Sequence, residues 1–300
     1  MFELHPDLFT PLKTNATLGP LLKPQDPFWT LFFKSRLTKT CLALLCGIIL
    51  LALIGPFISG HPFDQAHLPL KNSAPSWSFW FGTDDLGRDV FTRVCYGARV
   101  SLLIGFAAAF IDLIIGVTWG ATSAFMGGFY DQISMRLCDI LGSLPKLLVV
   151  MILTLVLGSG LFPIILAIAL IGWVPMARII RGEVLSIMQQ DYILSGIAAG
   201  ASYPRLLVHY LIPNVMSVVT VATTMTIPKA IFLEAFLSFL GIGVQAPYAS
   251  WGTMAHEALS GMIYYPWRLI FPALLMSLTI LCFNVIGDAL QQTFSLQENQ

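Results

Sequence analysis

Long apolar runs alternate with short polar segments from residue 41 to residue 290. A membrane-spanning helix needs about 20 consecutive apolar residues to cross roughly 30 Å of hydrocarbon. The run 41–59 meets this requirement without a charged residue, and five later runs have a similar character. The pattern therefore predicts an all-α integral membrane protein. Its six predicted transmembrane helices are residues 41–59, 100–125, about 137–157, 161–177, 206–230 and 267–290.

The polar segments divide the chain into tails, a loop and a core. Residues 1–40 are rich in proline and lack an early apolar run, so they are predicted to be a tail and not a signal peptide. Residues 60–98 are predicted to form an external loop, 99–290 a core of five transmembrane helices, and 291–300 a short polar tail. Six spans place both termini on one side, and the excess of Lys and Arg there predicts that this side is cytoplasmic.

The later spans contain helix-breaking residues. A proline inside a helix removes a backbone hydrogen bond and clashes with the preceding turn. We therefore expect the fourth span to be short and interrupted by Pro163 and Pro175, and the fifth to be bent by Pro213 and Pro228. The apolar segment that follows Glu234 is too short to cross a bilayer, so it is predicted to be re-entrant or interfacial.

The second span carries small or polar residues at every fourth position: Asp112, Gly116, Gly120 and Ala124. A small-x-x-x-small stripe of this kind lets two helices approach closely. Asp112 is a charge within an apolar run, and such groups usually face the interior of a helix bundle. We expect Asp112 to serve packing or hydrogen bonding, with a role in transport as the alternative.

Other charged residues lie near the ends of the predicted spans. Arg136 and Asp139 are three residues apart on a predicted helix and could pair. Lys146 is expected to extend its ammonium group toward the membrane interface. The candidate structural or transport residues are Asp112, Arg136, Asp139, Arg178, Glu234 and Asp288.

Residues 191–213 are the least hydrophobic long stretch inside the apolar part of the sequence. Asp191 can cap a helix there, because its carboxylate can accept hydrogen bonds from the free N–H groups of the first turn. Gly200 suits the position after the helix, where a positive φ is needed, and Pro204 prevents simple continuation. The pattern predicts one short helix of small residues outside the bilayer, with a shape suited to binding by another protein.

Composition narrows the possible function classes. Of the 300 residues, 56% are hydrophobic and only 11% are charged, whereas soluble domains carry roughly 25% charged residues. The net charge is zero, so no nucleic-acid partner is predicted. The cysteines and histidines show no disulfide or metal-ligand spacing. No phosphate-binding loop or catalytic constellation is present, so we expect no enzyme activity and no cofactor. Energy for active transport would come from another subunit.

Several segments resemble a single family of membrane proteins. Residues 82–102 read G-T-D-D-L-G-R-D-V-F-T-R-V-C-Y-G-A-R-V-S-L and are closely similar to a segment of the C-type permeases of dipeptide, oligopeptide and nickel ABC importers. The G-G-x-x-D-x(4)-R-x-x-D-x(3)-S-x-P pattern of residues 127–145 resembles the same permeases. Further similar segments are 173–181, 234–252 and 284–288.

The segment 191–213 resembles the cytoplasmic loop of these permeases, E-A-A-x-x-x-G-x(9)-I-x-L-P. Gly200 and Pro213 match at the right spacing, and Leu194 stands where the family has its glutamate. The resemblance implies a coupling helix that docks on an ATPase. The implied coupling residues are Asp191, Tyr192, Leu194, Ser195, Gly196, Ala199, Gly200, Ala201 and Pro213.

The resemblance also implies a fold, a set of partners and a cargo. The fold is that of a type I ABC importer permease, placed in the lipid of the bacterial cytoplasmic (inner) membrane. The partners are a second, related permease in a heterodimer, two cytoplasmic ABC ATPase subunits and an extracytoplasmic peptide-binding protein. The cargo is a dipeptide or oligopeptide, with nickel or a nickel chelate as the alternative. A third hypothesis is an ion-coupled carrier or channel that uses Asp112, Lys229 and Glu234.

Overall fold

The chain folds into a bundle of helices in the computed structural model, which describes residues 27–158 and 160–298. Residues 1–26 of the predicted tail lie outside the described residues. The longer helices are α2 (Arg36–Ile58), α3 (Val90–Met126), α4 (Gly128–Ser143), α5 (Lys146–Leu157), α6 (Leu161–Met188), α9 (Ile212–Phe239) and α11 (Trp267–Glu298). The short ones are α1 (Phe28–Phe32), α7 (Asp191–Ala198), α8 (Tyr203–Leu206) and α10 (Trp251–Ala258).

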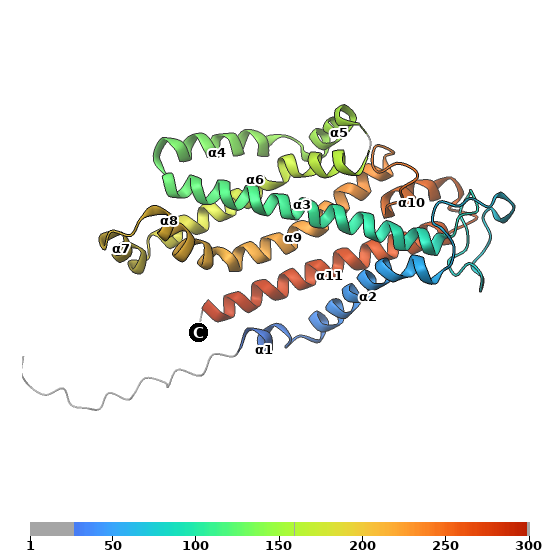
Figure 1. Cartoon of the computed structure of the whole chain (residues 1–300), viewed down its shortest axis with the longest axis horizontal. Coiled ribbons are helices and arrows are strands. Elements are labelled where there is room, and N and C mark those ends of the chain that lie inside the picture. Colours follow the sequence, from blue (N-terminus) through green and yellow to red (C-terminus); the bar gives the residue numbers. More distant parts are fainter. Residues whose placement is uncertain (1–26, 159, 299–300) are drawn as a thin grey trace, which may run out of the picture.

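Among the described residues, five helical segments are long and apolar enough to cross a membrane: α2, α3, α6, α9 with the turn before it, and α11. Helices α4 and α5 pass the same test only as a pair, which gives the predicted six when the pair counts as one broken span. Apart from α5, which turns away from α4, the longer helices run along the length of the molecule, with α7 and α8 at one end and α10 at the other (Figure 1). The end of α11 lies toward the same end as α7.

Several helices extend beyond the apolar runs that predicted them. Helix α3 begins at Val90, inside the segment expected to be an external loop, because the carboxylate of Asp89 accepts hydrogen bonds from the N–H groups of Phe91 and Thr92. Helix α2 begins at Arg36 and α11 continues to Glu298, so the predicted tails are partly helical. Apolarity marks the part of a helix within the membrane, whereas capping decides where the helix ends.

Prolines do not interrupt α6 as predicted. Pro163 lies in its first turn, where the missing N–H has no partner to lose, and Pro175 sits inside a continuous helix that runs to Met188. A single internal proline removes one bond of the ladder, and the remaining bonds and the packing of α6 hold the helix. Helix α9 likewise passes Pro228 and includes Glu234. The predicted re-entrant segment after Glu234 therefore begins as the last turn of α9.

The predicted third span, about 137–157, is two helices. Helices α4 and α5 differ in direction by 86° across the break at Leu144 and Pro145. The residue before a proline is pushed out of the helical region, and Leu144 accordingly has extended angles, φ −73° and ψ 138°. The break makes Lys146 the first residue of α5.

The small-residue stripe of the second span packs against α6. A Cβ atom added to Gly116 would lie 2.6 Å from Cβ of Met176, and one added to Gly120 would collide with the backbone carbonyl of Ala177. Ala124 is buried in the same region. The predicted close approach of two helices at this stripe is therefore confirmed.

Arg99 of α3 compensates for a proline in α2. Pro56 has no N–H, so the carbonyl of Ala52, four residues earlier, loses its partner in the helix. The guanidinium of Arg99 donates to this carbonyl at 2.5 Å and to the carbonyl of Leu53 at 2.6 Å. A charged donor thus replaces a missing backbone donor and joins α3 to α2.

Candidate functional site

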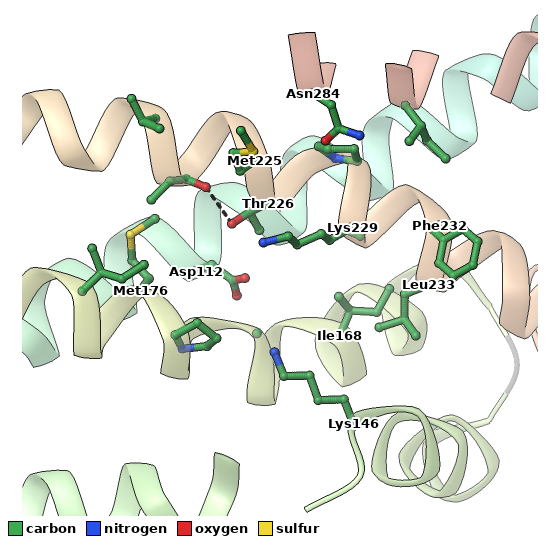
Figure 2. Close-up of a pocket in the computed structure, with 18 of the residues that line it drawn as sticks. Asp112, Lys146, Ile168, Met176, Met225, Thr226, Lys229, Phe232, Leu233 and Asn284 are labelled. Atoms are coloured by element: carbon green, nitrogen blue, oxygen red, sulfur yellow. Dashed lines mark hydrogen bonds between the residues drawn. The ribbon is translucent and has the colours of Figure 1, made fainter. Parts of the chain in front are cut away.

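A cavity of about 860 Å³ lies among α3, α5, α6, α9 and α11. Its volume is within the roughly 300–1,000 Å³ typical of ligand sites. Most of its wall is apolar, and its polar groups include Asp112, Lys146, Thr226, Lys229 and Asn284, drawn in Figure 2. A cavity with polar and charged groups in an otherwise apolar wall, lying between membrane-spanning helices, is a candidate path for a hydrophilic solute.

Asp112 of α3 is the buried charge of this cavity. Asp112 is only 2% exposed, and its Oδ1 has no hydrogen-bond partner among the described residues. Gly172 of α6 makes room for it, because a Cβ atom there would lie 2.5 Å from Oδ2 of Asp112. The expected packing role is seen at Gly172, but the expected hydrogen bond is not found at Oδ1.

Two lysines bring positive charge to the same cavity. Lys146 comes from the start of α5, and Lys229 comes from α9, directly after Pro228. Figure 2 shows both ammonium groups on the side of the cavity where Asp112 lies, one from each flank. Within the described part of the chain, neither lysine forms an ion pair with Asp112. Lys146, which is expected to extend toward the membrane interface, has its side chain in the wall of the cavity.

The predicted short helix outside the span region is α7. Ile193 anchors it, because this side chain is only 2% exposed and packs in one buried cluster with Val184 of α6 and Val215 of α9. Gly200 has φ +80°, and the N–H of Ala201 donates to the carbonyl of Gly196 at 3.0 Å. This is the hydrogen bond of a Schellman C-cap, so the predicted positive φ at Gly200 is confirmed.

Most of the remaining predicted coupling residues lie on the surface of segment 191–213. Asp191 is the first residue of α7, where a carboxylate suits the helix dipole. Asp191, Tyr192, Ser195, Ala199 and Gly200 are exposed, and Gly196 and Ala201 are half-buried. The side chain of Leu194 lies outside the described part of the structure. Pro213 is the second residue of α9 and follows a π-helical turn, Leu207–Leu211.

Ion pairs join α4 to α6. Arg181 donates from Nε to Oδ1 of Asp131 at 2.6 Å and from Nη2 to Oδ2 at 2.5 Å, a bidentate arrangement. Arg178 donates to Oδ1 of Asp139 at 3.2 Å and to the carbonyl of Cys138 at 2.7 Å. The predicted pair of Arg136 with Asp139 is wrong, because the cation beside Asp139 comes from α6 while Arg136 is exposed.

Glu234 has a fully satisfied structural setting. Its residue is 0% exposed, and it accepts hydrogen bonds from the hydroxyl groups of Ser101 at 3.0 Å and Ser238 at 2.7 Å. Ser101 and Ser238 in turn accept from the backbone N–H groups of Trp251 and Val244. Glu234 thereby ties α9 to α3 and α10 and lies outside the cavity wall. Asp288, the last candidate, is exposed on α11 and is also absent from that wall.

A network of ion pairs joins the start of α3 to α10, at the end of the molecule away from α7. Arg93 donates to Glu257 at 2.7 Å and to Asp84, and Arg88 donates to Asp84 at 2.6 Å and to Glu257 at 3.1 Å. Burial alone would raise the pKa of Asp84, but the guanidinium groups of Arg93 and Arg88 hold it below its ordinary value of 3.8. This network accounts for three of the charged residues of segment 82–102, namely Asp84, Arg88 and Arg93.

A helical, multiply spanning protein with a cavity that contains charged groups and a capped helix at one end has the architecture expected of a transport permease. Residues 113–296 match the family described as binding-protein-dependent transport system inner membrane component, and residues 25–75 match the N-terminal TM domain of oligopeptide transport permease C. The chain therefore belongs to the family of inner membrane components of binding-protein-dependent transport systems. It is a multi-pass inner membrane protein and a permease.

Curated relatives cover nearly the whole chain. The oligopeptide transport system permease protein OppC of Bacillus subtilis (strain 168) is 49% identical over 97% of this chain and 97% of its own length. The dipeptide transport system permease protein DppC of the same organism is 47% identical over 93% of this chain and 88% of its length. The glutathione transport system permease protein GsiD of Escherichia coli O1:K1 / APEC is 38% identical over 91% and 92%.

Proposed function

We propose that this chain is the permease subunit of an ABC importer that translocates dipeptides or oligopeptides across the cytoplasmic membrane. The observation that carries the proposal is the 49% and 47% identity, over nearly the full chain, to permeases named for oligopeptide and dipeptide transport. These names favour a peptide over nickel. The cavity of about 860 Å³ supports the same conclusion, because its largely apolar wall can accept varied side chains.

The proposed assembly contains a second, related permease, two cytoplasmic ATPases and an extracytoplasmic peptide-binding protein. The cavity supports the need for a second permease. Lys146 and Lys229 are exposed in the single chain although they lie on helices of the span region. Exposed charge at such a depth is costly in lipid, so another protein surface or water must face it.

In this proposal, residues 191–213 dock on an ATPase at the cytoplasmic end, where both termini also lie. The exposed residues of α7 and its C-cap offer the contact surface, and the buried Ile193 fixes α7 to the core. Closure of the ATPase dimer on ATP would push α7, and α6 and α9 would carry that movement to the cavity as rigid bodies.

The test is transport of a labelled dipeptide in proteoliposomes that contain the whole complex. ATP is either supplied or omitted on the side of the membrane that carries the ATPases. Ala199→Arg places a bulky cation on the exposed coupling surface and should lower ATP-driven uptake about tenfold, which corresponds to a lost docking contact. Ser186→Arg is the matched control, because Ser186 is an exposed small residue of α6 outside α7. The control should retain uptake.

Three results would contradict the proposal in different ways. Uptake that follows an ion gradient and ignores ATP would favour the ion-coupled carrier. ATP-driven uptake of nickel without uptake of peptide would restore the nickel hypothesis. Equal loss of uptake in Ala199→Arg and Ser186→Arg would mean that the coupling surface is not confined to α7 and its C-cap.

A further inference from the structure

Asp112 differs from two other acidic groups of the helix bundle, Glu234 and Asp131, in having an oxygen without a hydrogen-bond partner among the described residues. Glu234 receives hydrogen bonds from two serines, and Asp131 holds a bidentate ion pair with Arg181. Asp112 is almost as buried as Glu234 and more buried than Asp131, yet its Oδ1 has no partner among the described residues. An unpaired charge in a membrane protein is costly and usually marks a functional site. The geometry leaves a buried hydrogen-bond acceptor without a partner, on a residue that lines the cavity.

The two lysines of the cavity are also left without an acidic partner inside the described chain. They come from helices α5 and α9, on either side of Asp112, and Figure 2 shows all three charges bordering one space. Among the described residues, none of these three charged groups forms a salt bridge within 4 Å. Two ammonium groups and one carboxylate can therefore receive a ligand that carries both signs.

We propose that Asp112 accepts hydrogen bonds from the α-ammonium group of a peptide, while Lys146 and Lys229 donate to its terminal carboxylate. The inference rests on the proposed function and assigns the part of the peptide that the cavity recognises. A peptide with free ends presents one ammonium and one carboxylate whatever its side chains are. Charge-assisted hydrogen bonds of this kind are about twice as strong as neutral ones.

The rest of the cavity wall supports recognition of the peptide ends over its side chains. Apolar residues such as Ile168, Ile171, Val221, Phe232 and Leu233 surround the charged groups. Such a wall discriminates weakly, since one methylene group changes binding only about 10- to 200-fold. A site built on charged groups, by contrast, rejects an analogue that lacks the matching group much more strongly. Side chains are thus tolerated while free ends are required.

The experiment compares three labelled substrates in proteoliposomes with the whole complex: a dipeptide, its N-acetyl derivative and its C-terminal amide. The same binding protein is used at saturating substrate, so any change in the ratio between substrates comes from the permease. Asp112→Asn should lower import of the free dipeptide about tenfold and remove the preference over the N-acetyl form. Lys146→Met combined with Lys229→Met should remove the preference over the amide.

Controls separate recognition from folding. Lys71→Met removes an exposed lysine of the external loop, outside the cavity, and should change no ratio. Asp112→Glu keeps the charge and should keep the preference for a free amino group. Gly172→Ala leaves the charge in place but displaces the carboxylate, because the added Cβ would lie 2.5 Å from Oδ2. It should weaken the same preference as Asp112→Asn. Assembly is checked by ATPase activity of the purified complex.

Several outcomes would overturn this inference while leaving the proposed function intact. One is ATP-driven import by Asp112→Asn with an unchanged preference over the N-acetyl dipeptide. Another is an equal fall in the import of all three substrates by the Asp112 and lysine variants. That result would mean that the charges serve the conformational change and not recognition of the peptide. If the unmodified complex imports no peptide with ATP, the proposed function itself fails.

Discussion

At the scale of single residues, Arg99 supplies the hydrogen bond that Pro56 cannot make within α2. The proline leaves the carbonyl of Ala52 without its helical partner, and the guanidinium of Arg99 donates to that carbonyl at 2.5 Å. Loss of a hydrogen bond from a charged group costs about 1.5–3 kcal/mol. We expect Arg99→Met to lower the thermal unfolding midpoint of the purified permease in detergent by several degrees.

A double variant tests the cause of that effect. Pro56→Ala restores an N–H four residues after Ala52, so the carbonyl regains a partner within α2. In the Pro56→Ala background, Arg99→Met should lower the unfolding midpoint clearly less than in the natural sequence, because the two changes act on one hydrogen bond. Additive effects of the two substitutions would show that Arg99 stabilises the protein in another way, such as its contact with the ring of Phe57.

Asp84 predicts a pH dependence of stability. A carboxyl whose pKa is lower in the folded than in the unfolded state stabilises the fold above the unfolded-state value, and this stability is lost as the pH falls through the folded-state value. The ordinary value is 3.8, and Arg93 and Arg88 hold the pKa of Asp84 below it. The difference in unfolding midpoint between the natural protein and Asp84→Asn should be constant near neutral pH and shrink below 3.8. A difference that persists unchanged into that acid range would contradict the assignment.

At the scale of elements, the contact of α3 with α6 depends on glycine. A Cβ atom at Gly120 would collide with the carbonyl of Ala177, which is backbone and cannot rotate away. Overpacking typically costs 1–3 kcal/mol, so Gly120→Leu should lower the unfolding midpoint and the yield of folded protein. Gly182→Leu on the open side of α6 is the control, since no atom lies within 4 Å of its added Cβ. Equal losses in both variants would contradict the packing explanation, and helix propensity could not account for them because leucine favours a helix more than glycine does.

The sequence predicts some elements well and others poorly, for identifiable reasons. Apolar runs and the Gly116 and Gly120 stripe depend on local pattern, and both correspond to features of the fold. The position of Gly200 follows from the conformation that a helix end requires. The continuity of α6 through Pro175 does not follow from local pattern, because the packing around a proline decides whether the helix continues.

The candidate site shows the same limit more strongly. Asp112 can be found as a charge in an apolar run, but its relation to Lys146 depends on the 86° break between α4 and α5. Likewise, the pairing of Asp139 with Arg178 joins positions 39 residues apart. No pattern within one helix specifies such contacts, so sequence spacing alone favoured the wrong partner, Arg136.

At the scale of the whole molecule, α6 connects the cavity to α7. Ile168, Ile171 and Ile179 of α6 line the cavity, and the same helix continues to Met188, directly before α7. Ile193 joins α7 to this structure through a buried contact. We expect Ile193→Ser to loosen α7, so that ATP hydrolysis by the complex continues while peptide uptake falls about tenfold.

Matched measurements distinguish this uncoupling from unfolding. Ile193→Val removes one methylene group, keeps an apolar side chain at the anchor and should retain most uptake. The ratio of peptide molecules imported to ATP molecules hydrolysed is the decisive quantity, because it does not depend on the amount of complex. A proportional fall of uptake and hydrolysis in Ile193→Ser would show that α7 is needed for assembly and not for transmitting movement.

The charged cavity also bears on the electrical side of import. The exposed ammonium groups of Lys146 and Lys229 require water around them when no solute is bound, so the voltage across the membrane falls mainly over the remaining dry layer. Moving one net charge through 100 mV involves about 2.3 kcal/mol, whereas a dipeptide with two free ends and neutral side chains carries none. Its import should be indifferent to an imposed potassium diffusion potential, and import of a lysine-containing dipeptide should follow that potential.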